Sequence, residues 1–392
     1  MPRAAAPLSR RALLRGGLTL GCSAAAFPLA TRVTFASAPG DNRLVVIVLR
    51  GALDGLAAIC PYADPELRRL RPTLALHPDD GAPDLDGRFA LHPALAPLLP
   101  FWQRGELAVA HAVSTPYRDR RSHFDGQDAL ENGAPGADGR LTPGRDGWLN
   151  RALAHLPGAR AQTAVAVGRE RMLLLDGANP ALSWSPDADP GLSPQALDLL
   201  TRIAAPDPLF AAAAAEAVQL AEAQAEPLRA DAAGLARLSA EMLRGEARIA
   251  AFSLGGFDTH RGQAGAIRRP LDRLAEAVTT LAEGLGPELW SRTAVLAVTE
   301  FGRTARENGA AGTDHGTGGA MLFAGGALSG AKVHGDFPGL ADLLDDRDLR
   351  PTEDLRRHAA WALRALFGLD RAALEQDIFP GLDMIRDTKV FA

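Results

Sequence analysis

Short runs of apolar and β-branched residues recur along this chain, and most lead into a polar or glycine-containing turn. Runs that are apolar on nearly every residue are typical of strands buried on both faces of a parallel sheet. The run at 293–299 leads directly to Glu300, and the run at 43–49 leads into a turn that carries Asp54. Such strands or apolar runs are expected at 43–49, 106–113, 163–167, 172–175, 248–254, 293–299 and 319–324.

Stretches with apolar residues at helical spacing separate these runs. Helices are expected at 62–70, 92–104, from near 125, at 148–156, at 206–243 with a break near Pro227, at 267–285 and at 352–369. Loops are expected at 79–89, 133–147 and 179–194, and a loop or hairpin at 325–335. Because strands and helices alternate, we expect an α/β fold, with a doubly wound, mostly parallel sheet and helices on both faces, in a single domain from residue 39 to 392.

The N-terminus has the pattern of an export signal. Ser9-Arg10-Arg11-Ala12-Leu13-Leu14 is a twin-arginine pattern, and a mildly apolar run follows from Gly16 to Ala30. The run is too short and too weakly apolar to span a membrane. Small residues near position 38 offer a cleavage region, so residues 1–38 are interpreted as a twin-arginine signal peptide. We therefore expect a periplasmic or secreted protein exported by the twin-arginine machinery; the alternative is a disordered basic tail.

Charge and cysteine content narrow the class of protein. Removing residues 1–38 deletes five arginines and no acids, so the formal net charge moves from −5 to −10. A protein this acidic is a poor partner for nucleic acid or anionic lipid. Of the 2 cysteines, Cys22 leaves with the leader, and Cys60 alone cannot form an internal disulfide.

Acids and histidines follow the predicted strands in separate parts of the chain. The carboxyl ends of parallel strands meet at one edge of a sheet, so these side chains should converge there. Converging carboxylates repel one another unless they are neutralised, and two divalent cations would do this. The predicted metal ligands are Asp54, Asp258, His260, Glu300, Asp314 and His315. For each acid the alternative is a helix cap or a turn residue.

Such a centre predicts a reaction class. Two ions about 3.5–4 Å apart can activate an attacking oxygen and stabilise a leaving oxygen in the hydrolysis of phosphate or sulfate esters. Arg303, Arg50 or Arg121 would then hold the remaining ester oxygens. Ser122 precedes a predicted helix, where a hydroxyl is either an ordinary cap or a nucleophile whose developing charge the helix dipole stabilises. Taken alone, this position favours the cap.

Five motifs carry a resemblance to a known family. They are LRGALDGL (49–56), SHFDGQDALENG (122–133), GGFDTH (255–260), TEFGRT (299–304) and GTDHG (312–316). In this order behind a twin-arginine leader, they resemble the secreted bacterial proteins grouped as domain of unknown function 1501. The resemblance covers essentially the whole mature chain.

The resemblance implies the alkaline phosphatase and sulfatase superfamily, whose members are doubly wound α/β hydrolases with one or two metal ions. It matches Asp54 to the metal-binding Asp after the first strand, and Asp258 with His260 to a later strand-end acid and histidine. It matches Asp314-His315-Gly316 to an Asp-His-Gly sequence. In the superfamily that sequence directly follows a strand-end Thr or Ser, where this chain has Thr299-Glu300. In the alternative assignment Glu300 is the strand-end ligand, and His315 is a later, separate histidine.

The resemblance leaves the nucleophile open. The sulfatase signature Cys/Ser-x-Pro-x-Arg is absent, and Arg121-Ser122-His123 lies in its place. Ser122 is the better chemical candidate, because a metal-bound alkoxide is an ordinary phosphohydrolase nucleophile. His123 is then a ligand or a general acid, and a hydrolase that uses bound water would not need Ser122.

Together these patterns predict a secreted metal-dependent hydrolase of phosphate or sulfate esters. Its catalytic residues would be Ser122, His123 and Arg303, and its cofactor one or two ions of zinc, manganese or calcium. Loops such as 179–194 and 325–335 would determine the substrate. The alternative from another class is a non-catalytic periplasmic binding or assembly protein that retains the hydrolase fold.

The leader gives the first testable prediction. Changing Arg10→Lys together with Arg11→Lys should leave the precursor in the cytoplasm, because the arginine pair is the address that the export machinery reads. Cell fractionation and immunoblotting would measure this. Normal accumulation of the double variant in the periplasm would contradict the prediction.

Overall fold

The computed structural model describes residues 41–118, 121–134, 146–184 and 231–392. At its centre is a sheet of 9 strands in the order β10-β4-β9-β8-β1-β7-β5-β6, with β11 paired to β4. These strands are β1 (Arg43–Leu49), β4 (Leu107–Ser114), β5 (Ala164–Val167), β6 (Leu182–Trp184), β7 (Ile249–Leu254), β8 (Thr293–Val298), β9 (Gly319–Ala324), β10 (Val333–His334) and β11 (Glu353–Asp354). A separate antiparallel pair joins β2 (Ile59–Cys60) to β3 (Ala90–Leu91).

The helices surround this sheet. The α-helices are α2 (Gly55–Ala58), α3 (Leu67–Leu70), α4 (Leu99–Gln103), α5 (His123–Asn132), α6 (Trp148–Ala154), α9 (Ala232–Arg244), α10 (Gln263–Ala266), α11 (Arg268–Trp290), α12 (Leu355–Phe367) and α13 (Arg371–Ala373). The short 3₁₀ segments are η1 (Pro78–Asp80), η2 (Pro93–Leu98), η3 (Ala161–Thr163) and η4 (Leu173–Leu175), and η5 (Leu374–Ile378) is a π-helical turn.

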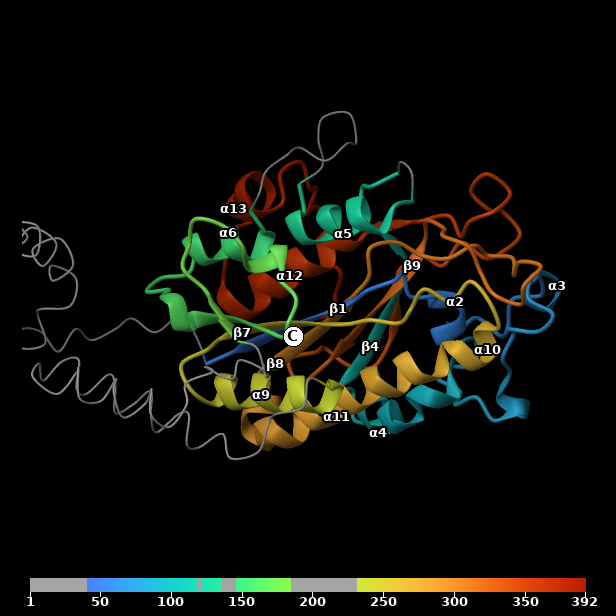
Figure 1. Cartoon of the computed structure of the whole chain (residues 1–392), viewed down its shortest axis with the longest axis horizontal. Coiled ribbons are helices and arrows are strands. Elements are labelled where there is room, and N and C mark those ends of the chain that lie inside the picture. The colour runs from blue at the N-terminus through green and yellow to red at the C-terminus, as the bar shows by residue number, and fades with distance from the viewer. Residues whose placement is uncertain (1–40, 119–120, 135–145, 185–230) are drawn as a thin grey trace, which may run out of the picture. The chain divides into compact units, whose positions relative to one another are not determined.

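The central strand β1 is buried along its whole length and contributes to two cores. Successive side chains of a strand point to opposite faces, so Val45 and Ile47 pack on one side while Leu44 and Val46 pack on the other. Helices α4, α9 and α11 cover the first face, and α5, α6 and α12 cover the second (Figure 1). The predicted α/β architecture, with helices on both faces, is confirmed.

Most of the strand pairs are parallel, as the sequence predicts. Strand β9 is the exception, because it runs antiparallel to both β8 and β4. The chain returns from the end of β8 through residues 299–318 without a crossover helix, and a return of this kind reverses the strand direction. These 20 or so residues include several of the predicted site residues.

Three sequence predictions differ from the structure. The apolar run 172–175 forms η4 and not a strand, because so short an apolar run does not distinguish a strand from a helical turn. The predicted loop 179–194 contains β6, which pairs with β5 at the edge of the sheet; residues 185–194 lie outside the described part. The helix expected at 62–70 is reduced to α3, because Pro65 interrupts its first half.

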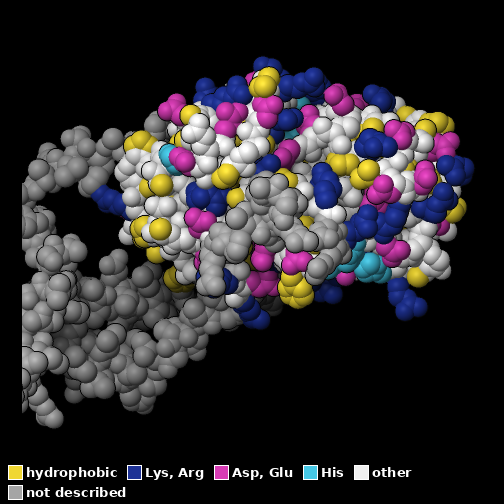
Figure 2. Space-filling view, turned by 90° about the horizontal axis from the view of Figure 1, so that it is seen from above, with side chains coloured by type: hydrophobic (Ala, Val, Ile, Leu, Met, Phe, Trp, Pro, Cys, Tyr) yellow, Lys and Arg dark blue, Asp and Glu magenta, His cyan; other side chains and the backbone are white. Residues whose placement is uncertain are grey.

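The long helical region expected at 206–243 is described only from residue 231, where Asp231 caps α9 with its carboxylate. In the described residues, no helix is both long and apolar enough to cross a membrane. On the face shown in Figure 2, acidic and basic side chains are interspersed, and hydrophobic side chains are scattered.

A buried histidine in β4 gives a prediction about stability and pH. His111 is fully buried between Phe89 and Phe337, and its Nε2 lies 2.9 Å from the carbonyl oxygen of Ile59. Burial lowers the pKa of His111 to about 4. Between that value and the ordinary pKa of ~6.5 the unfolded chain binds a proton that the folded chain does not, so stability falls as pH falls.

We expect the wild-type protein to lose about 2 kcal/mol of unfolding free energy through His111 between about pH 7.5 and pH 5. Urea unfolding at the two pH values would measure the loss. His111→Asn should show a pH dependence smaller by this amount, whatever its absolute stability. Equal pH dependence in the two proteins would contradict the prediction.

Candidate metal centre

The loops that follow β1, β4, β7 and β8 lie at the same edge of the sheet, because these strands run in the same direction. The loop from β8 to β9 adds residues 312–316 to this edge. Most of the predicted site residues lie in these segments, and the structure brings His123, Asp258, His260 and His315 together as the inner group.

The inner group is a cluster of nitrogen and oxygen donors. Nε2 of His260 lies 2.9 Å from Oδ1 of Asp258 and 3.0 Å from Nε2 of His315. Nε2 of His315 is 3.2 Å from Oδ1 of Asp258, and Nε2 of His123 is 3.4 Å from its Oδ2. One donor atom each of His123, Asp258 and His315 lie within 4.8 Å of one another. The Asp258 side chain is 43% exposed, so solvent reaches the cluster.

Each of the three histidines turns its other ring nitrogen toward a fixed acceptor. Nδ1 of His123 lies 2.8 Å from Oε1 of Glu300, and Nδ1 of His315 lies 2.8 Å from the carbonyl oxygen of Arg121. Nδ1 of His260 lies 3.2 Å from Oδ1 of Asp314. Carboxylate and carbonyl oxygens only accept hydrogen bonds, so in a neutral ring the proton is on Nδ1. Nε2 then presents a lone pair.

The lone pairs of three imidazoles therefore face the Asp258 carboxylate. Among the described residues, the buried Nε2 of His123 has no hydrogen-bond partner. Nitrogens 3.0 Å apart that both present lone pairs repel one another unless a proton or a metal ion lies between them. Imidazole nitrogens held by acceptors on the opposite side of the ring are the usual ligands of zinc and similar ions. The residues present thus fit a divalent transition-metal ion.

Glu300 lies behind His123. Its carboxylate is fully buried and accepts hydrogen bonds from the amide of Gly51 at 2.9 Å and from Oγ1 of Thr299 at 3.0 Å, besides that from His123. Burial acts to raise the pKa of Glu300, but the hydrogen bond from His123 and those from Gly51 and Gln127 outweigh it and lower the pKa. In turn, the hydrogen bond to Glu300 raises the pKa of His123 against the effect of burial. Glu300 thus holds the ring of His123 in place.

Asp314 likewise holds the ring of His260 in place through its contact with Nδ1. Oδ1 of Asp314 also accepts from Nδ2 of Asn308 at 3.0 Å, and this hydrogen bond is the main reason why the pKa of Asp314 is lowered. For Asp258, burial is the largest single influence and acts to raise the pKa. The charges of Arg303, His260 and His123 together outweigh it, so the pKa of Asp258 is lowered. All three acids therefore carry charge at neutral pH.

Arg303 neutralises Asp258. It is almost fully buried, and its NH2 group donates to Oδ1 of Asp258 at 2.6 Å. Its other hydrogen bonds go to the carbonyl oxygens of Ala52, Thr313 and Phe257 at 3.0–3.1 Å, and to Nε2 of His260 and the carbonyl oxygen of Gly51 at 3.4 Å. These contacts favour a positioning role for Arg303. Its predicted contact with ester oxygens stays a prediction.

Asp54 lies outside the inner group. It is buried, it caps α2 through Ala57, and its other oxygen accepts from NH1 of Arg71 at 2.8 Å and from Nε2 of Gln263 at 2.5 Å. None of these partners belongs to the inner group. Its predicted role as a metal ligand therefore stays a prediction, and its contacts favour a structural role.

The remaining candidates lie at the start of α5 and beside it. Oγ of half-buried Ser122 accepts from the amide of Asp125 at 3.4 Å, which is a long capping bond. Arg121 bonds Asp348 at 3.0 Å, and Arg50 pairs with Glu131 and Glu170, both at 2.9 Å. Both arginines are thus engaged, although Arg121 remains 37% exposed.

Several contributors were not predicted from the sequence. The ring of Phe301 stacks on His123, with ring centres 5.3 Å apart, and also contacts His315. The sequence offered one signal for Phe301, since it directly follows the candidate ligand Glu300 in the TEFGRT motif. Arg71, Gln263 and Asn308 gave no comparable signal, because nothing in their local sequence distinguishes them from surface residues.

Two glycines permit the loops to approach one another. Gly51 has φ 108°, and a Cβ there would lie 2.6 Å from the amide nitrogen of Asp258. A Cβ on Gly316 would lie 2.4 Å from the carbonyl carbon of Arg303. Larger residues at either position would push these loops apart and separate the ligands that they carry.

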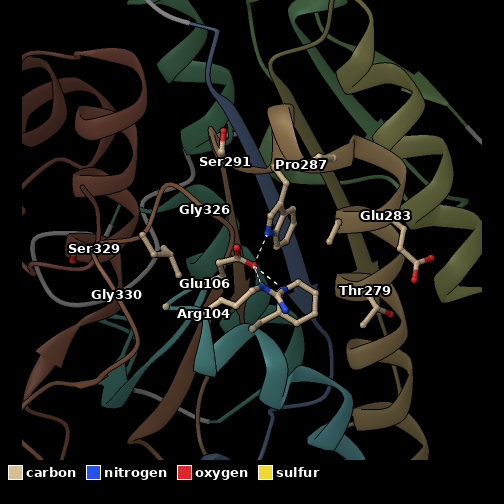
Figure 3. A pocket seen from close by; sticks show the side chains of 14 residues that line it. Arg104, Glu106, Thr279, Glu283, Pro287, Ser291, Gly326, Ser329 and Gly330 are labelled. Atoms are coloured by element: carbon tan, nitrogen blue, oxygen red, sulfur yellow. Dashed lines mark hydrogen bonds and ion pairs between the residues drawn. The ribbon is translucent and has the colours of Figure 1, made fainter.

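A cavity of about 760 Å³ lies at the opposite edge of the sheet, where β4 and β8 begin. Figure 3 shows Glu106 at its centre, with Oε2 accepting from Nε1 of Trp290 at 3.2 Å and from Arg104 at 2.9 Å. Arg104, Glu106 and Trp290 are thus bonded to one another, and the residues that line the cavity include no histidine or cysteine. We therefore place the chemistry at the histidine cluster and not in this cavity.

Two solved structures are similar to this chain. One is a protein in the alkaline phosphatase superfamily from Vibrio parahaemolyticus, with 12% identity and a TM-score of 0.39, over 87% of this chain and 70% of that chain. The other is the lipoteichoic acid synthase LtaP from Listeria monocytogenes, with 8% identity and a TM-score of 0.42, over 88% of this chain and 76% of that chain. Similarity at this level carries nothing about activity.

The family of this chain was identified by comparing its sequence with known proteins and with family models. No curated protein matches the chain. A family model described as "Protein of unknown function (DUF1501)" matches residues 41–359, which is well over half of the chain and includes the whole histidine cluster. The chain therefore belongs to the DUF1501 family.

Proposed function

We propose that this protein is an exported, metal-dependent hydrolase of phosphate or sulfate esters. The observation that carries the proposal is the convergence of three imidazole lone pairs on the Asp258 carboxylate, with a buried Nε2 of His123 that has no hydrogen-bond partner in the described residues. Export rests on the twin-arginine pattern alone, because residues 1–40 lie outside the described part.

Four residues would hold the ion: His123, Asp258, His260 and His315. A divalent ion held by these residues would polarise an ester oxygen and make a bound hydroxyl more acidic. Glu300, Asp314 and the carbonyl of Arg121 fix the three rings from behind, so the donors need little reorganisation before they bind. Phe301 stacks on His123 and limits rotation of that ring.

Ser122 is the nucleophile in this proposal. It is adjacent to His123 and lies at the N-terminus of α5, where the helix dipole stabilises negative charge on its oxygen. Its capping bond to the amide of Asp125 is long at 3.4 Å, so little is lost when the hydroxyl turns toward a substrate. The same bond also favours the second candidate, a binding or assembly protein in which Ser122 is only a helix cap.

The first prediction here concerns the ion. A ligand bound only to the folded state at about 100 times its dissociation constant adds ~2.7 kcal/mol of stability. Treatment with a chelator should therefore lower the melting temperature, and zinc or manganese should restore it. Calorimetry with elemental analysis would measure both.

His123→Ala should abolish the response to metal, whereas His155→Ala on the surface at the end of α6 should behave as the wild type. An unchanged melting temperature with chelator, together with no metal in the purified protein, would rule out the proposed centre. In that case the histidines and acids form a hydrogen-bonded network only.

The second prediction concerns Ser122. Ser122→Ala should reduce hydrolysis of an activated aryl phosphate or sulfate on the order of 10³-fold or more, because deletion of a nucleophile has effects of this size. Metal content should not change. Steady-state kinetics and elemental analysis on the same samples would test this.

Ser122→Asn is the matched control for helix capping. Asparagine caps a helix as well as serine does but has no hydroxyl, so its variant should keep the stability and lose the activity. Wild-type activity in Ser122→Asn would assign the attack to water or to another residue. No hydrolysis of any ester by the metal-loaded wild type would favour the binding protein.

A further inference from the structure

We infer that the centre holds a single divalent ion, because the buried guanidinium of Arg71 already neutralises Asp54, one of the acids that the sequence predicts as metal ligands. The inference rests on the proposed function, since it presupposes that the histidine cluster binds a metal. It concerns the number of ions and the role of a buried ion pair, neither of which the family membership specifies.

The acceptor capacity of Asp54 is already used. Oδ1 accepts from the amide of Ala57 at 3.2 Å. Oδ2 accepts from Arg71 at 2.8 Å and from Gln263 at 2.5 Å, and Oγ1 of Thr313 approaches it to 3.5 Å. A carboxylate has about four lone-pair positions, so little room remains for a metal ion on these oxygens. Asp54 is also only 1% exposed.

Arg71 cannot move away to admit an ion. It is fully buried, and its Nε donates to the carbonyl oxygen of Ala305 at 2.8 Å while its NH2 donates to that of Thr304 at 2.7 Å. Each of its three nitrogens therefore has a fixed partner, one of which is Asp54. A guanidinium stays charged at any ordinary pH, so it is a permanent counter-ion.

Asp258 is also paired with a buried arginine. Arg303 donates to Oδ1 of Asp258 and to the carbonyl oxygens of four other residues. Among the described residues, no arginine pairs with Oδ2 of Asp258, which faces His123. The two arginines thus neutralise one oxygen of each aspartate, and they leave one place where unprotonated donors converge.

The Arg71–Asp54 pair also supports the cluster indirectly. Oε1 of Gln263 accepts from Oγ1 of Thr313 at 2.6 Å and from Oγ1 of Thr259 at 2.9 Å, and these threonines flank the ligand-bearing turns. Through this buried network Asp54 is tied to the turns that carry His260 and His315. We therefore assign Asp54 and Arg71 as positioning residues, outside the metal's own ligands.

The number of ions per chain tests the inference directly in the wild-type protein. The chain would be stripped with chelator, loaded with zinc or manganese, freed of excess metal and measured by plasma mass spectrometry and by calorimetric titration. We expect a single tight ion per chain. Two tight ions would overturn this inference while leaving the proposed hydrolase standing, whereas the absence of any tight ion would overturn both.

A pair of variants separates ligands from positioning residues. Asp54→Asn combined with Arg71→Met removes both charges without leaving either unpaired. It should still bind a single ion, with affinity lowered about 10–100-fold, because these residues position the ligands and do not touch the metal. Asp258→Asn, matched in chemistry to the first change, should lose the ion. Circular dichroism would confirm that the variants compared are folded. Loss of tight metal from the folded double variant, equal to that in Asp258→Asn, would show that Asp54 is a ligand and would overturn the inference.

Discussion

The register of β1 between β7 and β8 is the constraint on which the rest of this structure depends. Leu49 at the end of β1 is paired with Leu254 at the end of β7, and Val48 is paired with Val298 at the end of β8. All three strands are buried and parallel, so a shift of one residue would turn apolar side chains toward the wrong face. The same register fixes where Asp258 and Glu300 emerge, and hence how far apart the loops of the site lie.

The strands were predictable because burial on both faces leaves a nearly continuous apolar run, as in β1 and β8. The general location of the site followed from the same runs, because parallel strands end at one edge. The apolar runs did not predict the roles of the individual acids. Glu300 faces the ring of a histidine 177 positions earlier in the chain, and no local pattern distinguishes an acid that orients a histidine from one that binds a metal.

Asp54 is a second acid whose role the local sequence does not reveal. Its counter-ion, Arg71, is only 17 positions away, yet the intervening sequence does not reveal that this arginine is buried and its neighbours Arg68 and Arg69 are exposed. The failures in secondary structure have a simpler cause. The runs at η4 and β6 are three residues each, and at that length tertiary pairing decides between a helical turn and a strand.

Two buried arginines, Arg71 and Arg303, pair with aspartates at this edge of the sheet. Breaking a buried pair by removal of one partner typically costs about 3–5 kcal/mol, because the other charge is left without compensation. The Arg71–Asp54 pair is buried on both sides, so it constrains the loops independently of any metal, and the cluster can keep its shape before an ion binds. Both arginines donate to backbone carbonyls of several loops at once, which ties those loops to one another.

The wide spacing of the ligands in the chain also bears on when and where an ion is acquired. His123, Asp258 and His315 come from segments that meet only after the strands between them have paired, so the donor set exists only in the nearly complete fold. A protein whose leader sends it through the twin-arginine route crosses the membrane folded. For such a protein a bound metal would be selected by its availability in the cytoplasm, whatever ions are present where the protein finally resides.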